Sequence, residues 1–138
     1  MKFILFHFLC LLSTVFSQNA DAETTKLKIL WEDMFTKYKT ECIAESGAAE
    51  TDVMNTFKTL ILPENDDLKC YFKCAYVKLS FLNENGNFVV SNLLTIPGGD
   101  DINMVTNCVG KVANESDLCN KVYKSLQCGL TTVLKGLQ

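Results

Sequence analysis

Apolar residues recur every three or four positions through most of the chain, which is the spacing of amphipathic helices. Pro63 and Pro97 are the only prolines, so little in the sequence interrupts a helix. The clearest pattern predicts a helix from Thr24 to Ser46, stopped by Gly47. Its apolar positions are Leu27, Leu30, Trp31, Met34, Phe35, Tyr38 and Cys42.

Five further helices are predicted after Gly47. The acidic residues 64–67 favour a helix start, because negative charge stabilises a helix N-terminus. Apolar positions continue at helical spacing after Cys128, so we expect the last ten residues to dock against the body of the protein. The first of these helices is capped at Thr51 or Asp52 and ends before Pro63. The second runs from the acidic stretch to about Leu82, before a turn at Gly86. The remaining three are predicted over residues 92–96, 101–112 and 117–128. The pattern predicts an all-α fold, a compact bundle of about six helices.

The N-terminus has a different pattern. Lys2 precedes an apolar run from Phe3 to Phe16, which is too short to span a bilayer comfortably. Ser17 suits the position before a signal-peptidase cut, with Ala20 and Ala22 as later options. We therefore expect residues 1–17 to be a signal peptide and 18–138 to be the mature domain of a secreted, extracellular protein.

Removal of a signal peptide changes the chemistry that is available. It takes away His7, the single histidine, and Cys10, one of seven cysteines. Six cysteines in a secreted chain predict three disulfides and no free thiol. Without histidine, the Ser-His and Cys-His catalytic pairs and the histidine-metal sites are excluded. We expect no enzyme activity, no metal ion and no cofactor.

The charge of the chain limits the classes of molecule that it can bind. All 13 basic residues are lysine and 16 residues are acidic, which gives a formal net charge of −3. Such a mildly acidic, arginine-free surface is unsuited to nucleic acid or to an anionic membrane. We expect neither nucleic-acid binding nor membrane insertion.

The stretch LKCYFKCAYVKL, residues 68–79, places Cys70 and Cys74 one helical turn apart. Zinc sites and redox dithiols use other spacings, and zinc sites commonly add histidines. Side chains four apart share a helix face but point in parallel, which suits bonds to two neighbouring elements. Phe72 and Tyr76 lie on the opposite face, so we place this helix at the centre of the domain.

The cysteine spacing is similar to that of a known family. The gaps between successive cysteines are 27, 3, 33, 10 and 8 residues, for Cys42, Cys70, Cys74, Cys108, Cys119 and Cys128. This pattern, with the segment LKCYFKCAYVKLSFLNENGNF, resembles the six-cysteine signature of the insect odorant-binding proteins. Six cysteines permit fifteen pairings, and the resemblance implies one interlaced set: Cys42–Cys74, Cys70–Cys119 and Cys108–Cys128.

The resemblance also implies a function. Members of the family carry small hydrophobic molecules, such as odorants or pheromones, through aqueous fluid inside an apolar cavity, which here would lie within a bundle stapled by three disulfides. A membrane chemoreceptor is then a candidate downstream partner, and we expect a monomer or a weak homodimer. The positions that resemble pocket-lining ones are Phe35, Phe57, Phe72, Tyr76, Phe88, Leu93 and Val105, with Val133 and Leu134 as a wall supplied by the tail.

The same residues also fit other interpretations. Any one of these apolar side chains could equally fill a solid core, and the Tyr76 hydroxyl could bind a backbone carbonyl instead of a ligand. The competing functional class is a secreted helical protein that acts through its surface, as a toxin, signalling factor or lipid-active module. For a carrier, a ligand of about ten to sixteen carbons is expected to bind with micromolar affinity.

Overall fold

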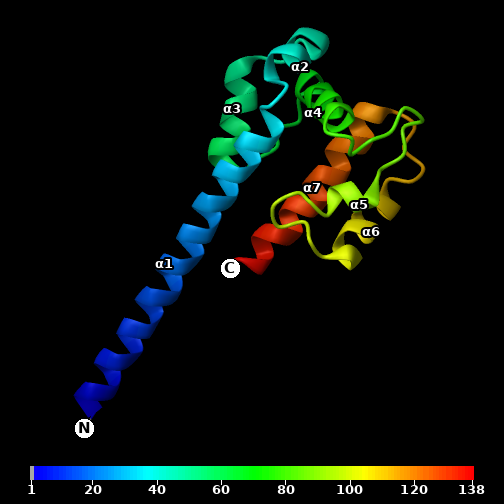
Figure 1. The fold of residues 1–138 in the computed structure, drawn as a ribbon. Helices are drawn as coiled ribbons and strands as arrows, with labels where there is room; N and C mark the ends of the chain where they lie inside the picture. The colour runs from blue at the N-terminus through cyan, green and yellow to red at the C-terminus, as the bar shows by residue number, and fades with distance from the viewer. Residues whose placement is uncertain (1) are drawn as a thin grey trace.

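The computed structural model describes the backbone of residues 2–138 and the side chains from residue 18 onward. The described residues form seven helices and no strand, with one isolated β-bridge between Leu82 and Phe88. Figure 1 shows the helices in order: α1 (Lys2–Phe35), α2 (Lys39–Ser46), α3 (Glu50–Thr59), α4 (Asp66–Lys78), α5 (Val90–Leu93), α6 (Ile102–Lys111) and α7 (Leu118–Gly136). The predicted all-α fold is confirmed.

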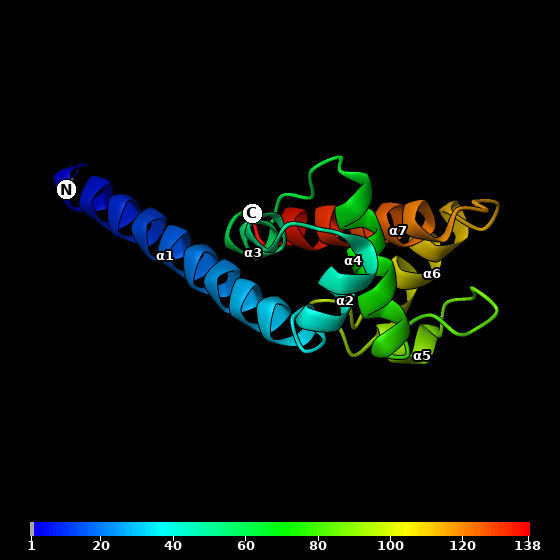
Figure 2. The ribbon, with the colours of Figure 1, turned by 90° about the horizontal axis from the view of Figure 1, so that it is seen from above.

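Helix α4 lies at the centre of the fold, as its two apolar faces predicted. It packs against α2 on one side and α7 on the other, while α6 lies along α7 and α3 lies against α1. The N-terminal half of α1 extends beyond the other six helices (Figures 1 and 2). The predicted signal peptide, residues 1–17, falls outside the residues whose side chains are described. Within the described part of the chain, no helix combines the length and apolar character that crossing a membrane requires.

The predicted first helix, Thr24 to Ser46, is wrong as one element, because a turn at residues 36–38 divides it into α1 and α2. The Phe35 carbonyl accepts a hydrogen bond from the buried Tyr71 hydroxyl at 2.8 Å. The Lys39 N–H donates instead to the Thr36 carbonyl. A tertiary hydrogen bond thus takes the place of a helical one, which the periodicity could not show. The stop at Gly47 is confirmed, with φ +77° in a left-handed cap.

Other predicted boundaries also move. Helix α3 begins at Glu50 with Ala49 as its N-cap, not at a Thr51 or Asp52 cap. Helix α4 ends at Lys78, before the predicted Leu82, because the chain turns and the Phe81 N–H donates to the Tyr76 carbonyl at 2.8 Å. Helices α5 and α6 fall within three residues of their predicted bounds, whereas α7 continues past Cys128 to Gly136. The tail therefore docks as part of a long helix, whose Val133 lies against Gly98.

Three disulfides join the helices in series. They connect α2 to α4 through Cys42–Cys74, α4 to α7 through Cys70–Cys119, and α7 to α6 through Cys108–Cys128. These are the pairs that the family resemblance implies. Because α4 and α7 each carry two half-cystines, the central helix pair is fixed both to itself and to its neighbours.

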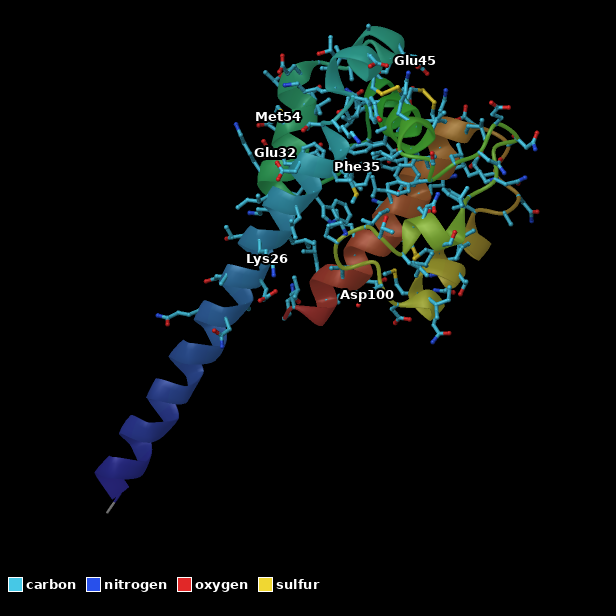
Figure 3. All side chains as sticks on the ribbon, viewed as in Figure 1. Lys26, Glu32, Phe35, Glu45, Met54 and Asp100 are labelled. Atoms are coloured by element: carbon cyan, nitrogen blue, oxygen red, sulfur yellow. A yellow bond between two sulfur atoms is a disulfide. The ribbon has the colours of Figure 1, made fainter. Side chains whose placement is uncertain are left out.

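A cluster of aromatic rings lies within the core. Phe35 is 1% exposed, and its ring lies within 6.3 Å, centroid to centroid, of five other aromatic rings. Figure 3 places Phe35 on the inner side of α1. Aromatic pairs of this kind add about 0.5–1.5 kcal/mol beyond the area they bury. The rings around Phe35 belong to Trp31, Phe57, Phe72, Tyr76 and Phe81.

Candidate functional site

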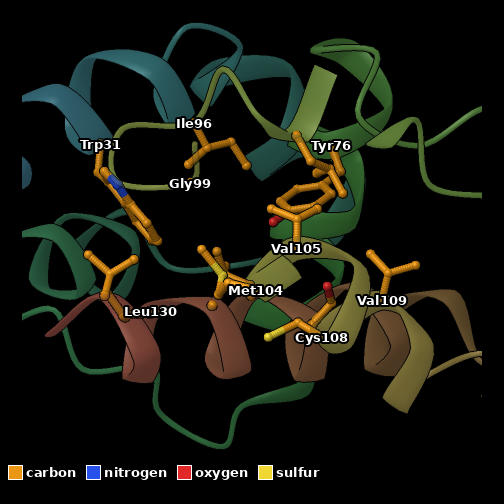
Figure 4. Close-up of a pocket in the computed structure, with 14 residues that line it drawn as sticks. Trp31, Tyr76, Ile96, Gly99, Met104, Val105, Cys108, Val109 and Leu130 are labelled. Carbon is orange, nitrogen blue, oxygen red and sulfur yellow. The ribbon is translucent and has the colours of Figure 1, made fainter. Parts of the chain in front are cut away.

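An apolar cavity lies beside this aromatic cluster, above the inner face of α7 (Figure 4). Its volume is about 50 Å³. Helices α1, α4, α5, α6 and α7 contribute to its walls, together with the loop that follows α5. The lining residues are Trp31, Tyr76, Leu93, Ile96, Gly99, Met104, Val105, Cys108, Val109, Ser125, Leu126, Gly129, Leu130 and Val133.

Helical spacing on α7 builds the floor of the cavity. Leu126, Gly129, Leu130 and Val133 follow one another at steps of three, one and three residues, and therefore lie on one face. From Ser125 to Val133 this face rises by about 12 Å, at about 1.5 Å per residue. The lining residues of α7 are therefore spread along the helix over more than two turns.

The loop after α5 closes one end of the cavity. The indole N–H of Trp31, on α1, donates a hydrogen bond of 2.8 Å to the Pro97 carbonyl. Next in the chain, Gly98 has φ +80°, and a Cβ there would come within 2.9 Å of a Val133 methyl. Only glycine allows the loop to approach α7 this closely. Trp31 therefore connects α1 to the wall that covers the α7 tail.

The structure brings four of the nine sequence-predicted ligand residues to this cavity. Tyr76, Leu93, Val105 and Val133 line it. The other five lie elsewhere: Phe35, Phe57 and Phe72 are buried in the aromatic cluster, Phe88 packs against Tyr76, and Leu134 is half-buried against the core.

Several residues that line the cavity were not predicted from the sequence, although the spacing of apolar residues indicated some of them. Trp31 lies on the same helical face as Leu27 and Phe35, four residues away on either side. Leu126 and Leu130 continue the apolar face of α7, and extending the last predicted helix through the tail would have placed them on one wall. Met104 and Gly129 offered no comparable signal.

Two hydroxyl groups are the polar features of the lining. Tyr76 is 2% exposed and Ser125 is 7% exposed. Burial raises the pKa of the Tyr76 hydroxyl far above its ordinary value, so the group remains a neutral hydrogen-bond donor at physiological pH. No lysine, histidine or carboxylate occurs among the lining residues.

This arrangement can hold an uncharged apolar molecule but offers little for catalysis. The described residues contain no group of three or more side chains able to bind a metal ion. Neither hydroxyl is near a lining base that could activate it as a nucleophile. The lining is therefore suited to holding an uncharged apolar molecule.

Comparison with known proteins agrees with this description. The model of the PBP/GOBP family matches residues 26–132. Odorant-binding protein 22 of Aedes aegypti is 27% identical over 97 residues, which is 67% of this chain and 69% of the relative. The chain belongs to the PBP/GOBP family, the insect odorant-binding protein family that the cysteine spacing resembles. This is a family of binding proteins and carriers rather than of enzymes.

Proposed function

We propose that this protein is a secreted carrier that takes up a small hydrophobic molecule in the cavity above α7 and transports it through aqueous fluid. The observation that carries the proposal is the apolar cavity above α7, lined without any charged side chain, in a chain of the PBP/GOBP family. Secretion rests on the predicted signal peptide, residues 1–17. An olfactory role with delivery to a membrane chemoreceptor fits this function.

The size of the cavity limits what enters without rearrangement. A water molecule needs roughly 10–15 Å³ of such space, so about 50 Å³ accommodates only a few water-sized groups. A ligand of about ten to sixteen carbons requires side chains to move. Met104 is suited to this, because an unbranched thioether changes its shape at low cost. The hydrocarbon chain length of the ligand that binds best thus reports how far the cavity expands.

The single tryptophan provides a direct test. Trp31 lines the cavity, so its fluorescence reports entry of a ligand without any added probe. Titration of oxidised protein lacking residues 1–17 with straight-chain alcohols is expected to give saturable, micromolar binding with an optimum chain length. Absence of any response, from a folded and fully bridged protein and with calorimetry also silent, would favour a protein that acts through its surface.

Binding is expected to be almost independent of pH between 7.4 and 6. Histidine is the side chain that ordinarily titrates in this interval, and His7 is the only one in the sequence. The cavity contains no carboxylate, and Tyr76 has a raised pKa, so no lining group changes charge there. The measurement is the Trp31 titration with one alcohol at both pH values. A tenfold loss of affinity at pH 6 would show this prediction to be wrong.

A further inference from the structure

Two buried polar side chains lack a hydrogen-bond partner, and both line the cavity. The hydroxyls of Thr56, Tyr71 and Tyr123 are also buried, but each donates to a backbone carbonyl. Tyr76 and Ser125 make no hydrogen bond through their side chains to any residue whose side chain is described. Every fully enclosed side-chain oxygen or nitrogen among the described residues has a partner. The two free oxygens are therefore not fully enclosed by protein, and both belong to residues that line the cavity.

The two hydroxyls belong to one end of the cavity. Figure 4 shows Tyr76 at the end opposite Trp31, with Leu130 near Trp31. Ser125 precedes Leu130 by five residues on α7, which places it about 7.5 Å further along the helix, away from Trp31. The Trp31 end is apolar, because the indole N–H is already used by the Pro97 carbonyl. The cavity thus has one polar end and one apolar end.

We propose that Tyr76 and Ser125 together select a neutral ligand that carries an oxygen function, such as an alcohol, aldehyde, ketone or ester. The ligand oxygen lies between the two hydroxyls, and its apolar remainder extends toward Trp31. A tyrosine hydroxyl donates and a serine hydroxyl both donates and accepts, so the pair serves a carbonyl or an alcohol. A plain hydrocarbon leaves both hydroxyls unpaired in a buried site, which is unfavourable. This inference rests on the proposed function, because it takes the cavity to be the ligand site.

The same lining selects against an ionised acid. Tyr76 from α4, Ser125 from α7 and the disulfide-bonded Cys108 from α6 are the only lining side chains with ionisable or hydroxyl chemistry. None supplies a positive charge. A carboxylate would enter without a counter-charge, and burial of an unpaired charge is strongly unfavourable. Neutral oxygen-containing ligands are therefore preferred to the carboxylates of the same chain length.

The test compares three ligands that share the hydrocarbon chain length that the protein binds best. They are the alcohol, the terminal fluoroalkane and the carboxylate. The fluoroalkane nearly matches the alcohol in size but is a poor hydrogen-bond partner. Trp31 fluorescence is titrated for the wild type, Tyr76→Phe and Ser125→Ala, at pH 7.4. Tyr123→Phe is the matched control, because its hydroxyl is buried outside the cavity and donates to the Leu62 carbonyl.

The wild type is expected to bind the alcohol about threefold to tenfold more tightly than the fluoroalkane, the range of one ordinary hydrogen bond. The carboxylate should bind at least about tenfold more weakly than the alcohol. Tyr76→Phe should remove most of the preference for the alcohol and leave fluoroalkane binding unchanged, whereas Tyr123→Phe should keep the preference. Ser125→Ala should remove part of it.

Three outcomes would overturn the inference. Equal binding of alcohol and fluoroalkane by the wild type would mean that the two hydroxyls bond to a trapped water molecule or to nothing, and not to the ligand oxygen. An unchanged preference in both Tyr76→Phe and Ser125→Ala would mean that other groups hold the oxygen. Carboxylate binding as tight as that of the alcohol would contradict the charge argument. In each case the ligands still bind, so the proposed carrier function survives. Failure of all three ligands would instead reject that function.

Discussion

Replacing Cys70 and Cys119 together by alanine is expected to lower the free energy of unfolding by about 4 kcal/mol. This disulfide closes the longest loop of the three, with a sequence separation of 49 residues. On the chain-entropy model, the loss of a cross-link stabilises the unfolded state more when the loop is longer. The bond also joins α4 to α7, the two helices that form the centre of the fold. Its loss therefore affects the whole bundle.

The matched control is the pair Cys108 and Cys128, which closes a loop with a separation of 20 residues. Its replacement by alanine is expected to cost about 3 kcal/mol. Equilibrium unfolding in urea, with the remaining disulfides verified by peptide mapping, measures both values. A larger loss from the shorter loop would show that strain or packing, and not loop entropy, controls the contribution of these bonds.

The second large effect is expected from Phe35→Ala, which should lower the free energy of unfolding by about 3–5 kcal/mol. Phe35 is almost completely buried and contacts rings from α1, α3, α4 and the segment after α4. Truncation removes those contacts and leaves a void that rigid neighbours cannot fill. For a domain whose net stability is of order 5–15 kcal/mol, this is a large fraction.

Phe35→Leu serves as the comparison, because it keeps an apolar side chain at the centre of the cluster and should cost much less. Urea unfolding of both variants measures the difference. A loss below about 1 kcal/mol for Phe35→Ala would mean that the cluster collapses around the missing ring.

The periodicity of apolar residues was sufficient to predict an all-α fold and most of its helices. It could not predict the break after Phe35, because that break depends on a hydrogen bond from Tyr71, 36 residues away in the sequence. It also placed the end of the last helix too early, at Cys128. Nothing in the tail stops a helix before Gly136, and Gly129 is tolerated within α7.

The candidate site was harder to predict than the fold. Phe57 and Phe72 have the burial expected of pocket residues, yet they pack against Phe35 and do not line the cavity. Tyr76 and Val105 have similar burial but face the cavity. Whether a buried side chain fills a core or lines a void depends on the volumes of its neighbours on other helices, which periodicity does not contain.

The glycines of α6 and α7 offer a direct test of the cavity. Gly129 lines it, and a Cβ at this position would meet only the Met104 sulfur, at an ordinary 3.9 Å. A leucine at this position therefore extends into the free space. Gly110 lies on the exposed side of α6, and a Cβ there would meet no atom within 4 Å. Both glycines lie inside helices, where replacing glycine by leucine gains up to about 1 kcal/mol in helix propensity.

The decisive measurement is the alcohol affinity of Gly129→Leu and Gly110→Leu, by Trp31 fluorescence and calorimetry, beside the wild type. If the cavity above α7 holds the ligand, Gly129→Leu should lose at least about tenfold in affinity, because about 50 Å³ cannot hold both a leucine side chain and a ligand. Gly110→Leu should bind as the wild type does. Equal affinity of a folded Gly129→Leu and the wild type would contradict binding in the cavity above α7 and place the ligand elsewhere on the protein.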